Sequence, residues 1–169
     1  SRGFCFIDLF SGLGGFHVAL DELGGKGVFA AEWEPTLNAL YEKNFGIEAW
    51  SDINDLKTDA EIDEKVPDHQ VLAAGFPCQP FSKAGDQLGF KDTTQGNLFF
   101  KVRQILGQTA ATFILENVPN ILYHDGGRTK DAIIEIEAGA IILATGYDVF
   151  DPSVIPEYGY TTINNVVTA

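Results

Sequence analysis

Short apolar runs of strand length alternate along the chain with longer segments whose apolar residues recur at a helical period. The strand-like runs are 4–10, 28–32, 71–74 and 112–117. The helical patterns are 16–23, 35–45 and 97–106, the first with Phe16, Ala19, Leu20 and Leu23 on one face. Strands that alternate with helices predict the α/β class, with a mostly parallel sheet covered by helices on both faces.

Glycine and proline mark the ends of several of these segments. Gly24, Gly25 and Gly27 follow the first helical pattern, and we expect them to break regular structure before the strand at 28–32. Pro35 suits the first position of the next helix, where its missing N–H costs nothing.

The segment 133–146 allows two interpretations. Glu135 and Glu137 alternate with Ile134 and Ile136, which is the pattern of a strand. The overlapping stretch 130–144 is equally compatible with a helix rich in β-branched residues that crosses back to the sheet. Periodicity leaves both open.

Length and composition predict one globular domain, 1–169, in a reducing compartment. The 169 residues are 45% hydrophobic and 21% charged, which is typical of globular proteins. The longest small or apolar run, Ala138–Ala144, is far shorter than the roughly 18 residues of a membrane span. Two cysteines without a CxxC pair favour the cytoplasm. Because the chain has no methionine, we expect a processed product or a piece of a longer protein.

Charge argues against a nucleic-acid-binding surface over the chain as a whole, since the net charge is −13. The segment 79–103 differs, with a balance of +2 from Lys83, Lys91, Lys101 and Arg103 against Asp86 and Asp92. Such a segment is either a solvated loop and helix or a surface that faces phosphates.

A glycine-rich turn follows the first strand, as in nucleotide-binding βα units. Gly12 and Gly14 come soon after Asp8, and Glu32 lies 17 residues past Gly15, close to the roughly 20-residue offset of a ribose-binding acid. Glycines let a ligand approach the backbone, and the helix that follows offers free N–H groups. The spacing is not GxGxxG, so a pyrophosphate ligand is not favoured over a plain tight turn or another ligand.

Two further segments place reactive groups after apolar strands. Cys78 lies between two prolines in the segment 75–82, just beyond the strand at 71–74, whereas Cys5 lies inside the first strand. Glu116 ends the next strand along the chain. A nucleophilic thiolate and a carboxylic acid on adjacent strand ends suit attack on an electron-poor ring whose nitrogen needs a proton.

Five motifs in this order resemble the amino-terminal, catalytic part of DNA (cytosine-5) methyltransferases of the bacterial restriction–modification type. The resemblance covers residues 3 to about 128. The motifs read FIDLFSGLGGF at 6–16, EWE at 32–34, DI at 52–53, GFPCQPFS at 75–82 and ENV at 116–118. The resemblance implies a Rossmann-like, S-adenosylmethionine-dependent methyltransferase fold, the transfer of a methyl group to cytosine C5, and no metal.

The same resemblance implies a cofactor site for S-adenosylmethionine. The glycine turn would hold the methionine part, Glu32 the ribose hydroxyls and Trp33 the adenine face, with Asp52 and Ile53 at the adenine edge and Pro77 beside the methyl donor. The implied cofactor-binding residues are Phe10, Gly12, Gly14, Glu32, Trp33, Asp52, Ile53 and Pro77.

It also implies the catalytic residues Cys78, Glu116 and Asn117. Cys78 would attack C6 of a cytosine flipped out of double-stranded DNA, Glu116 would hydrogen-bond or protonate N3, and Asn117 would help to fix that edge. A mobile loop over the DNA would contain Gln79, Ser82, Lys83 and Lys91.

The last forty residues depart from the family pattern. The Gln-Arg-Arg motif, the target-recognition region and the final cofactor motif are missing, so we expect a truncated catalytic part that binds DNA weakly alone. A non-catalytic module that needs a complementing subunit is the alternative. Residues 138–169 resemble a segment of a heterodisulfide-reductase large-subunit flavoprotein, which predicts a junction near 128–137 and an atypical segment 129–169. Thirty-two residues are too few to bind FAD alone, so a flavin-linked redox fragment is the less favoured alternative.

Overall fold

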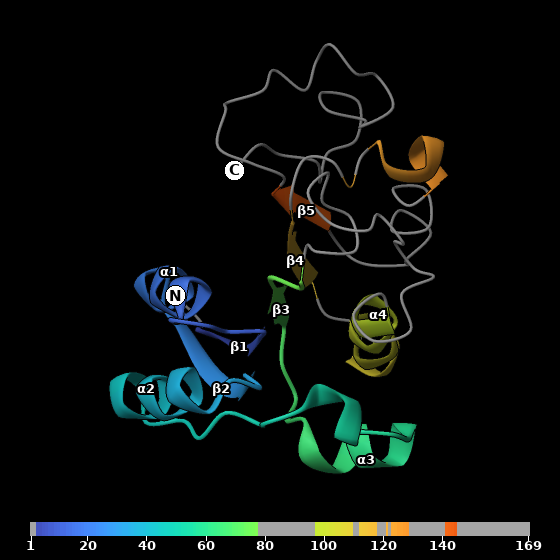
Figure 1. Ribbon diagram of the computed structural model, residues 1–169. Coiled ribbons are helices and arrows are strands. Elements are labelled where there is room, and N and C mark those ends of the chain that lie inside the picture. The colour runs from blue at the N-terminus through green and yellow to red at the C-terminus, as the bar shows by residue number, and fades with distance from the viewer. Residues whose placement is uncertain are drawn as a thin grey trace.

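The computed structural model describes residues 3–77, 97–109, 112–117, 121, 123–128 and 141–144 (Figure 1). Five strands form one parallel sheet in the order β2-β1-β3-β4-β5. The strands are β1 (Phe4–Leu9), β2 (Gly25–Ala31), β3 (Val71–Ala74), β4 (Thr112–Glu116) and β5 (Ile141–Ala144). The helices are α1 (Gly15–Glu22), α2 (Pro35–Phe45), α3 (Asp59–Lys65) and α4 (Asn97–Thr109), with short 3₁₀ turns η1 (Ile53–Asp55) and η4 (His124–Gly127).

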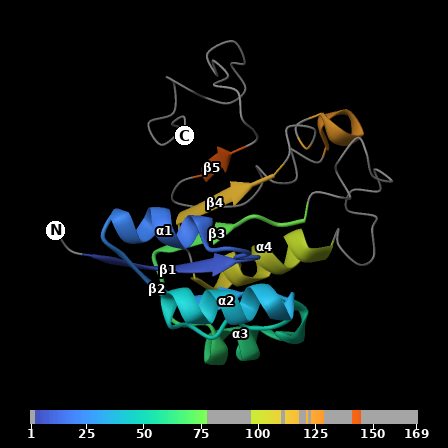
Figure 2. The same ribbon diagram turned by 60° about the vertical axis from the view of Figure 1, so that its left-hand side comes forward.

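The strand order reverses at β1, which has β2 on one side and β3 on the other. All strands run in one direction, so their carboxyl ends share one edge of the sheet (Figure 2). In parallel α/β sheets, ligands bind at the carboxyl edge, beside the strand where the order reverses. The fold therefore places the ends of β1 and β3 at the position expected of a ligand site.

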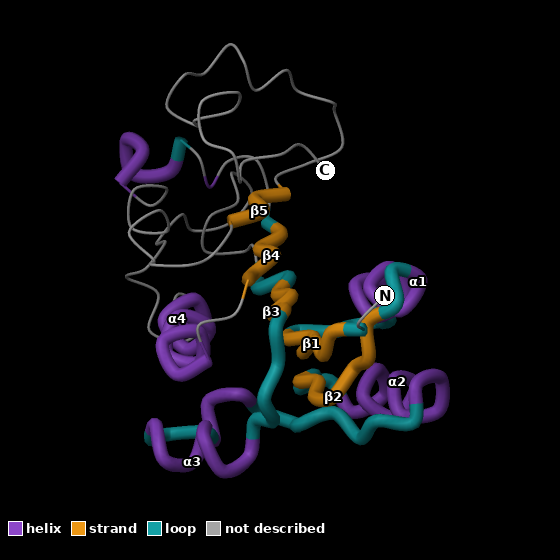
Figure 3. Tube along the Cα trace, turned by 180° about the vertical axis from the view of Figure 1, so that it is seen from behind, coloured by secondary structure: helices purple, strands orange, loops and turns teal. Residues whose placement is uncertain are grey.

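Helices cover both faces of the sheet, as predicted (Figure 3). Helices α1 and α2 lie on one face, where Leu20 packs with Phe6, and Tyr41 with Ala30. Helices α3 and α4 lie on the other, over the larger hydrophobic core. That core includes Ile7, Leu9, Ile62, Leu72, Phe99, Val102, Ile105, Phe113 and Leu115. The α/β class and the parallel sheet predicted from the alternation of strands and helices are confirmed, and the strand order agrees with the Rossmann-like fold that the resemblance implies.

The apolar face predicted for the first helix is half right, because Leu20 is buried and Phe16 packs against the same cluster, but the other two residues are exposed. The side chains of α1 that are buried are His17 and Leu20, whereas Ala19 is exposed and Leu23 is 75% exposed. Helix α1 ends at Glu22, so Leu23 lies beyond the last helical turn. A two-turn helix gives too few residues for its period to fix which side faces the sheet.

Strand β2 begins at Gly25, three residues earlier than predicted. A Cβ on Gly25 would come within 2.8 Å of the Leu20 carbonyl oxygen, and one on Gly27 within 2.5 Å of the His17 ring. These glycines thus permit α1 to lie close against the strand. Glycine was interpreted as a break in regular structure, whereas here it allows close contact inside it.

Of the two interpretations of the carboxyl-terminal segment, a strand is found at Ile141–Ala144, where β5 pairs in parallel with β4. The neighbouring residues 129–140 and 145–169 lie outside the described part of the chain, so the division into 1–128 and 129–169 stays a prediction. None of the helices in the described ranges has the length and apolar character needed to cross a membrane.

Candidate functional site

The turn after β1 has an unusual backbone conformation. Phe10 has a φ of 59°, Gly12 of 53° and Gly14 of 84°, all in the left-handed region. For a bulky residue such as Phe10 this conformation costs about 1–3 kcal/mol, and such strain is concentrated at ligand sites. The turn is closed by a 2.8 Å hydrogen bond from Gly14 N–H to the Ser11 carbonyl.

The turn leads directly into α1 and presents unused polar groups. Gly14 is the N-cap of α1, with no side-chain hydrogen bond to the free amides and no acidic residue in the first turn. The hydroxyl of Ser11 is buried and has no hydrogen-bond partner among the described residues. Free N–H groups at a helix start and an unpaired buried hydroxyl are typical of a site that binds a polar ligand.

The carboxylate of Glu32 is fixed beside this turn. Glu32 follows β2 and is only 6% exposed. Its Oε2 accepts a 2.8 Å hydrogen bond from Gly12 N–H, and its Oε1 accepts one of 2.9 Å from Glu34 N–H. Each oxygen has a second lone pair, so the oriented carboxylate is able to accept hydroxyl donors from a ligand.

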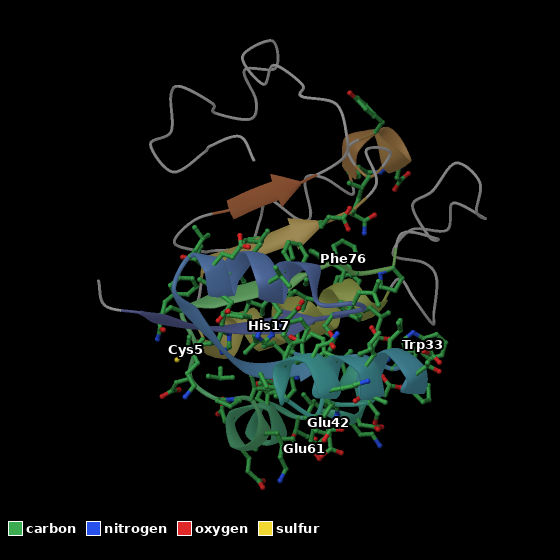
Figure 4. All side chains as sticks on the ribbon, turned by 90° about the vertical axis from the view of Figure 1, so that its left-hand side faces the viewer. Cys5, His17, Trp33, Glu42, Glu61 and Phe76 are labelled. Atoms are coloured by element: carbon green, nitrogen blue, oxygen red, sulfur yellow. The ribbon has the colours of Figure 1, made fainter. Side chains whose placement is uncertain are left out.

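The residues proposed for an adenine lie around Glu32. Trp33 is 75% exposed and lies toward the end of the sheet opposite Cys5 (Figure 4). The segment before Asp52 runs along β2, since Glu32 N–H donates to the Trp50 carbonyl at 2.9 Å and the Trp50 indole donates to the Asp52 carbonyl at 3.0 Å. The structure thus brings Trp33 and Asp52 to the same edge as Glu32.

Asp52 and Ile53 differ in what they offer at this edge. Asp52 is exposed and its carboxylate accepts from Asn54 N–H at 2.9 Å, which caps η1. Ile53 is 3% exposed, and its side chain belongs to the main hydrophobic core. Only the backbone of Ile53 is therefore suited to direct contact with a ligand.

The ends of β3 and β4 are tied together by a side chain. The buried Asn117 amide donates from Nδ2 to the Phe76 carbonyl oxygen at 2.8 Å. The Glu116 carboxylate also faces this segment, because a Cβ on Gly75 would lie 3.5 Å from Glu116 Oε2. Partial burial raises the pKa of the Glu116 carboxyl above its ordinary value. That shift favours a carboxyl that acts as a proton donor.

Several predicted site residues lie outside the described ranges. Pro77 is half-buried and is the last described residue of its segment. Cys78, Gln79, Ser82, Lys83 and Lys91 fall in the segment 78–96, which the structure does not describe.

Two cations of the segment 79–103 belong to α4 rather than to a loop. Lys101 donates from Nζ to the Leu56 carbonyl and at 2.7 Å to Gln104 Oε1, so it ties α4 to η1. Arg103 is exposed. The positive balance of the segment therefore does not translate into a surface of four free cations.

Sequence reasoning missed a set of buried polar side chains beneath the turn. Asp8 and His17 are buried, and Tyr41 of α2 joins them through its hydroxyl. The available signal was an aspartate in the middle of an otherwise apolar strand run. Among the described residues, no cluster of His, Cys, Asp and Glu is arranged to hold a metal ion.

Comparison with known proteins identifies the family of this chain. The family model for C-5 cytosine-specific DNA methylases matches residues 4–149. The chain belongs to this family. The match confirms the resemblance inferred from the five motifs, and it extends past the junction expected near 128–137.

Curated members of the family are close in sequence and longer. Type II methyltransferase M.HaeII of Haemophilus aegyptius is 46% identical over 128 residues, 75% of this chain and 38% of that protein. M.HpaII of Haemophilus parainfluenzae is 43% identical over 153 residues, 90% of this chain and 40% of that protein. The chain thus spans about two-fifths of the length of these relatives.

The fold is that of a solved methyltransferase. The crystal structure of S. pombe Dnmt2 methyltransferase matches with a TM-score of 0.58 over 79% of this chain and 40% of that chain, at 20% sequence identity. This likeness supports the assignment of the Rossmann-like methyltransferase fold.

Proposed function

We propose that this chain is the catalytic part of a DNA (cytosine-5) methyltransferase that binds S-adenosylmethionine at the glycine turn. The observation that carries the proposal is the buried Glu32 carboxylate, held by Gly12 N–H across a strained turn in a chain of this family. Because the chain spans about two-fifths of the length of these relatives, the methyltransferase activity of the complete enzyme is also part of what we propose.

The residues present fit such a cofactor. The free amides at the start of α1 and the unpaired Ser11 hydroxyl suit the methionine carboxylate, and the oriented Glu32 carboxylate suits the ribose hydroxyls. The exposed Trp33 ring suits adenine, with Asp52 and the Ile53 backbone at its edge. Phe10 and Gly14 shape the turn, and Pro77 would lie beside the reacting centre. When bound, S-adenosylmethionine supplies the methyl group.

The catalytic roles remain those implied by the family. Cys78 would add to C6 of a cytosine extruded from the duplex, which moves electron density to C5. Glu116 would donate a hydrogen bond or proton to N3, in keeping with its raised pKa. Asn117 would hold the end of β4 against Phe76, so that Glu116 faces the segment that leads to Cys78.

Double-stranded DNA is the proposed substrate, and Gln79, Ser82, Lys83 and Lys91 are proposed to face it. Binding by this chain alone is expected to be weak and unspecific, because the net charge is −13. A second chain that supplies DNA recognition is the alternative form of the proposal.

A two-part experiment tests the proposal. Calorimetric titration of the full chain with S-adenosylmethionine should give binding, and its absence in a folded sample would refute the cofactor site. The second part uses an oligonucleotide with 5-fluorocytosine at a mismatch, where base extrusion costs least. The reaction contains S-adenosylmethionine; after methyl transfer C5 carries fluorine, which is not released as a proton is, so the covalent adduct should persist on a denaturing gel. Cys78→Ser should abolish the adduct, and Cys5→Ser should retain it.

A further inference from the structure

A carboxyl group lies in the middle of the sheet, under the glycine turn, and takes no part in the proposed chemistry. Asp8 is the fifth residue of β1 and is 0% exposed. Its neighbours in register on the two adjacent strands are Ala30 and Ala73, which are also buried and bring no charge. Burial of a carboxyl at such a position costs free energy unless the group is protonated or hydrogen-bonded.

Helix α2 brings the Tyr41 hydroxyl to Asp8, and helix α1 brings the His17 ring to that hydroxyl. The Tyr41 hydroxyl lies 3.4 Å from Asp8 Oδ2 and 2.6 Å from His17 Nδ1. Asp8 Oδ1 is buried and forms no hydrogen bond of good geometry with the described residues. Asp8, Tyr41 and His17 therefore form a buried chain of three groups joined by one hydroxyl.

A single hydroxyl proton gives this chain two arrangements. When Asp8 is ionised, Tyr41 donates to the carboxylate and neutral His17 must donate from Nδ1–H to the Tyr41 oxygen. When Asp8 is protonated, it is able to donate to Tyr41, which then donates to an Nδ1 that carries no proton. The protonation state of Asp8 thus selects the His17 tautomer.

The same side chains support the backbone of the glycine turn. A Cβ on Gly14 would collide with the Phe45 ring and lie 3.2 Å from Tyr41, so these rings lie directly beneath the turn. The His17 ring stacks on Phe45 with centroids 4.0 Å apart. A change in the hydrogen bond between Tyr41 and His17 is therefore expected to alter the packing of the rings beneath Gly14.

In the part of the chain that the structure describes, three titratable residues act on Asp8. His17 comes from α1, Tyr41 from α2 and Glu32 from the end of β2. The residue of β3 beside Asp8 is the uncharged Ala73. The Asp21 carboxylate opposes the lowering of the pKa of His17. Burial raises the pKa of Asp8 to about 7, and the nearby Glu32 carboxylate adds to the rise. The Tyr41 hydroxyl and the His17 backbone N–H oppose it.

We propose that Asp8, acting through Tyr41 and His17, is a positioning residue for the glycine turn, and that its protonation state sets the affinity for a cationic cofactor. This inference rests on the proposed cofactor site. S-adenosylmethionine carries a positive sulfonium, which offsets the repulsion between Asp8 and Glu32. Binding then favours ionised Asp8, and by linkage the affinity rises with pH, by about three- to tenfold between pH 5.5 and 8.5.

The test is calorimetric titration with S-adenosylmethionine across that pH range, on the full chain and three variants. Asp8→Asn and Tyr41→Phe keep the shape of the side chains. Asp8→Asn should flatten the pH dependence, and Tyr41→Phe should move it to higher pH, because the Tyr41 hydroxyl lowers the pKa of Asp8. Glu42→Gln is the matched control, since Glu42 lies on the exposed side of α2 next to Tyr41, whereas His17 lies inside (Figure 4). Ionisation of the cofactor's own amino group contributes equally to all four proteins. Circular dichroism at each pH verifies folding.

A spectroscopic measurement on the free protein gives a second readout. The ¹⁵N shift of His17 Nδ1 should change between its two tautomer values with a midpoint near pH 7, and this change should vanish in Asp8→Asn. A constant tautomer, or parallel affinity curves for wild type and Asp8→Asn, overturns this inference and leaves the cofactor site standing. A folded chain that binds no cofactor at any pH overturns both.

Discussion

The backbone N–H of Gly12 donates a 2.8 Å hydrogen bond to the carboxylate of Glu32, joining the turn after β1 to the end of β2. The two residues are 20 positions apart in sequence and follow two adjacent strands. The acidic group predicted to bind a ribose therefore also holds the shape of the turn predicted to bind the rest of the cofactor.

Replacement of Glu32 should weaken cofactor binding. Glu32→Ala removes a carboxylate that is buried and already oriented, so we expect a loss of about 1–3 kcal/mol in the binding free energy of S-adenosylmethionine. Glu32→Gln should lose less, because its amide oxygen still accepts one hydrogen bond. The measurement is calorimetric titration, with the exposed Glu48→Ala as control. Equal affinity of Glu32→Ala and wild type would place the ribose elsewhere.

Gly14 and Gly24 form a matched pair for the role of the turn. Both have left-handed φ values, 84° and 85°, but a Cβ on Gly14 would strike Phe45 whereas one on Gly24 meets open space. Gly24→Ala should cost about 1 kcal/mol of unfolding free energy from backbone strain alone. Gly14→Ala should cost about 3 kcal/mol and abolish cofactor binding. Urea unfolding measures both, and similar losses would show that contact with Phe45 is unimportant.

The free energy of unfolding should depend on pH because of the ionisation of Asp8. Its folded pKa of about 7 lies above the ordinary value of 3.8, so the folded state holds the proton more tightly than the unfolded chain. Unfolding free energy contributed by this group therefore falls as pH rises from about 4 to 7 and is constant above. Asp8→Asn lacks this dependence.

Relative to wild type, Asp8→Asn should gain about 2–3 kcal/mol of unfolding free energy between pH 5 and pH 8. The lowered pKa of His17 acts in the opposite sense, since stability from the neutral ring is lost at acidic pH, but both proteins share it. Urea unfolding at several pH values measures the difference. A constant difference would mean that Asp8 keeps the same charge throughout.

Glu116→Gln should slow covalent adduct formation on 5-fluorocytosine DNA about a hundredfold, because an amide is unable to transfer a proton to N3. The raised pKa of Glu116 also predicts that wild-type adduct formation declines as pH rises through that pKa, since only the protonated carboxyl donates. Rates are measured by quenching on denaturing gels, with Glu48→Gln as control. An unchanged rate would remove Glu116 from proton transfer.

The sequence by itself determined the family and most of the order of strands and helices, although it did not predict α3 and left the segment that contains β5 open. Alternation of apolar runs with helical patterns predicted β1, β3 and β4 closely, and the motif residues Gly12, Glu32 and Glu116 all lie at the carboxyl edge of the sheet. These features are local, because hydrophobic periodicity, turn residues and short motifs each depend on residues that are close in sequence.

Only the tertiary structure decided what lies beneath the turn. Gly25 and Gly27 sit inside a strand, and the buried side of α1 is that of His17, because α1 packs closely against β2. The link from Asp8 through Tyr41 to His17 joins three elements across 33 residues. Periodicity marks which residues are apolar, but which polar groups meet in the interior depends on how the helices dock on the sheet.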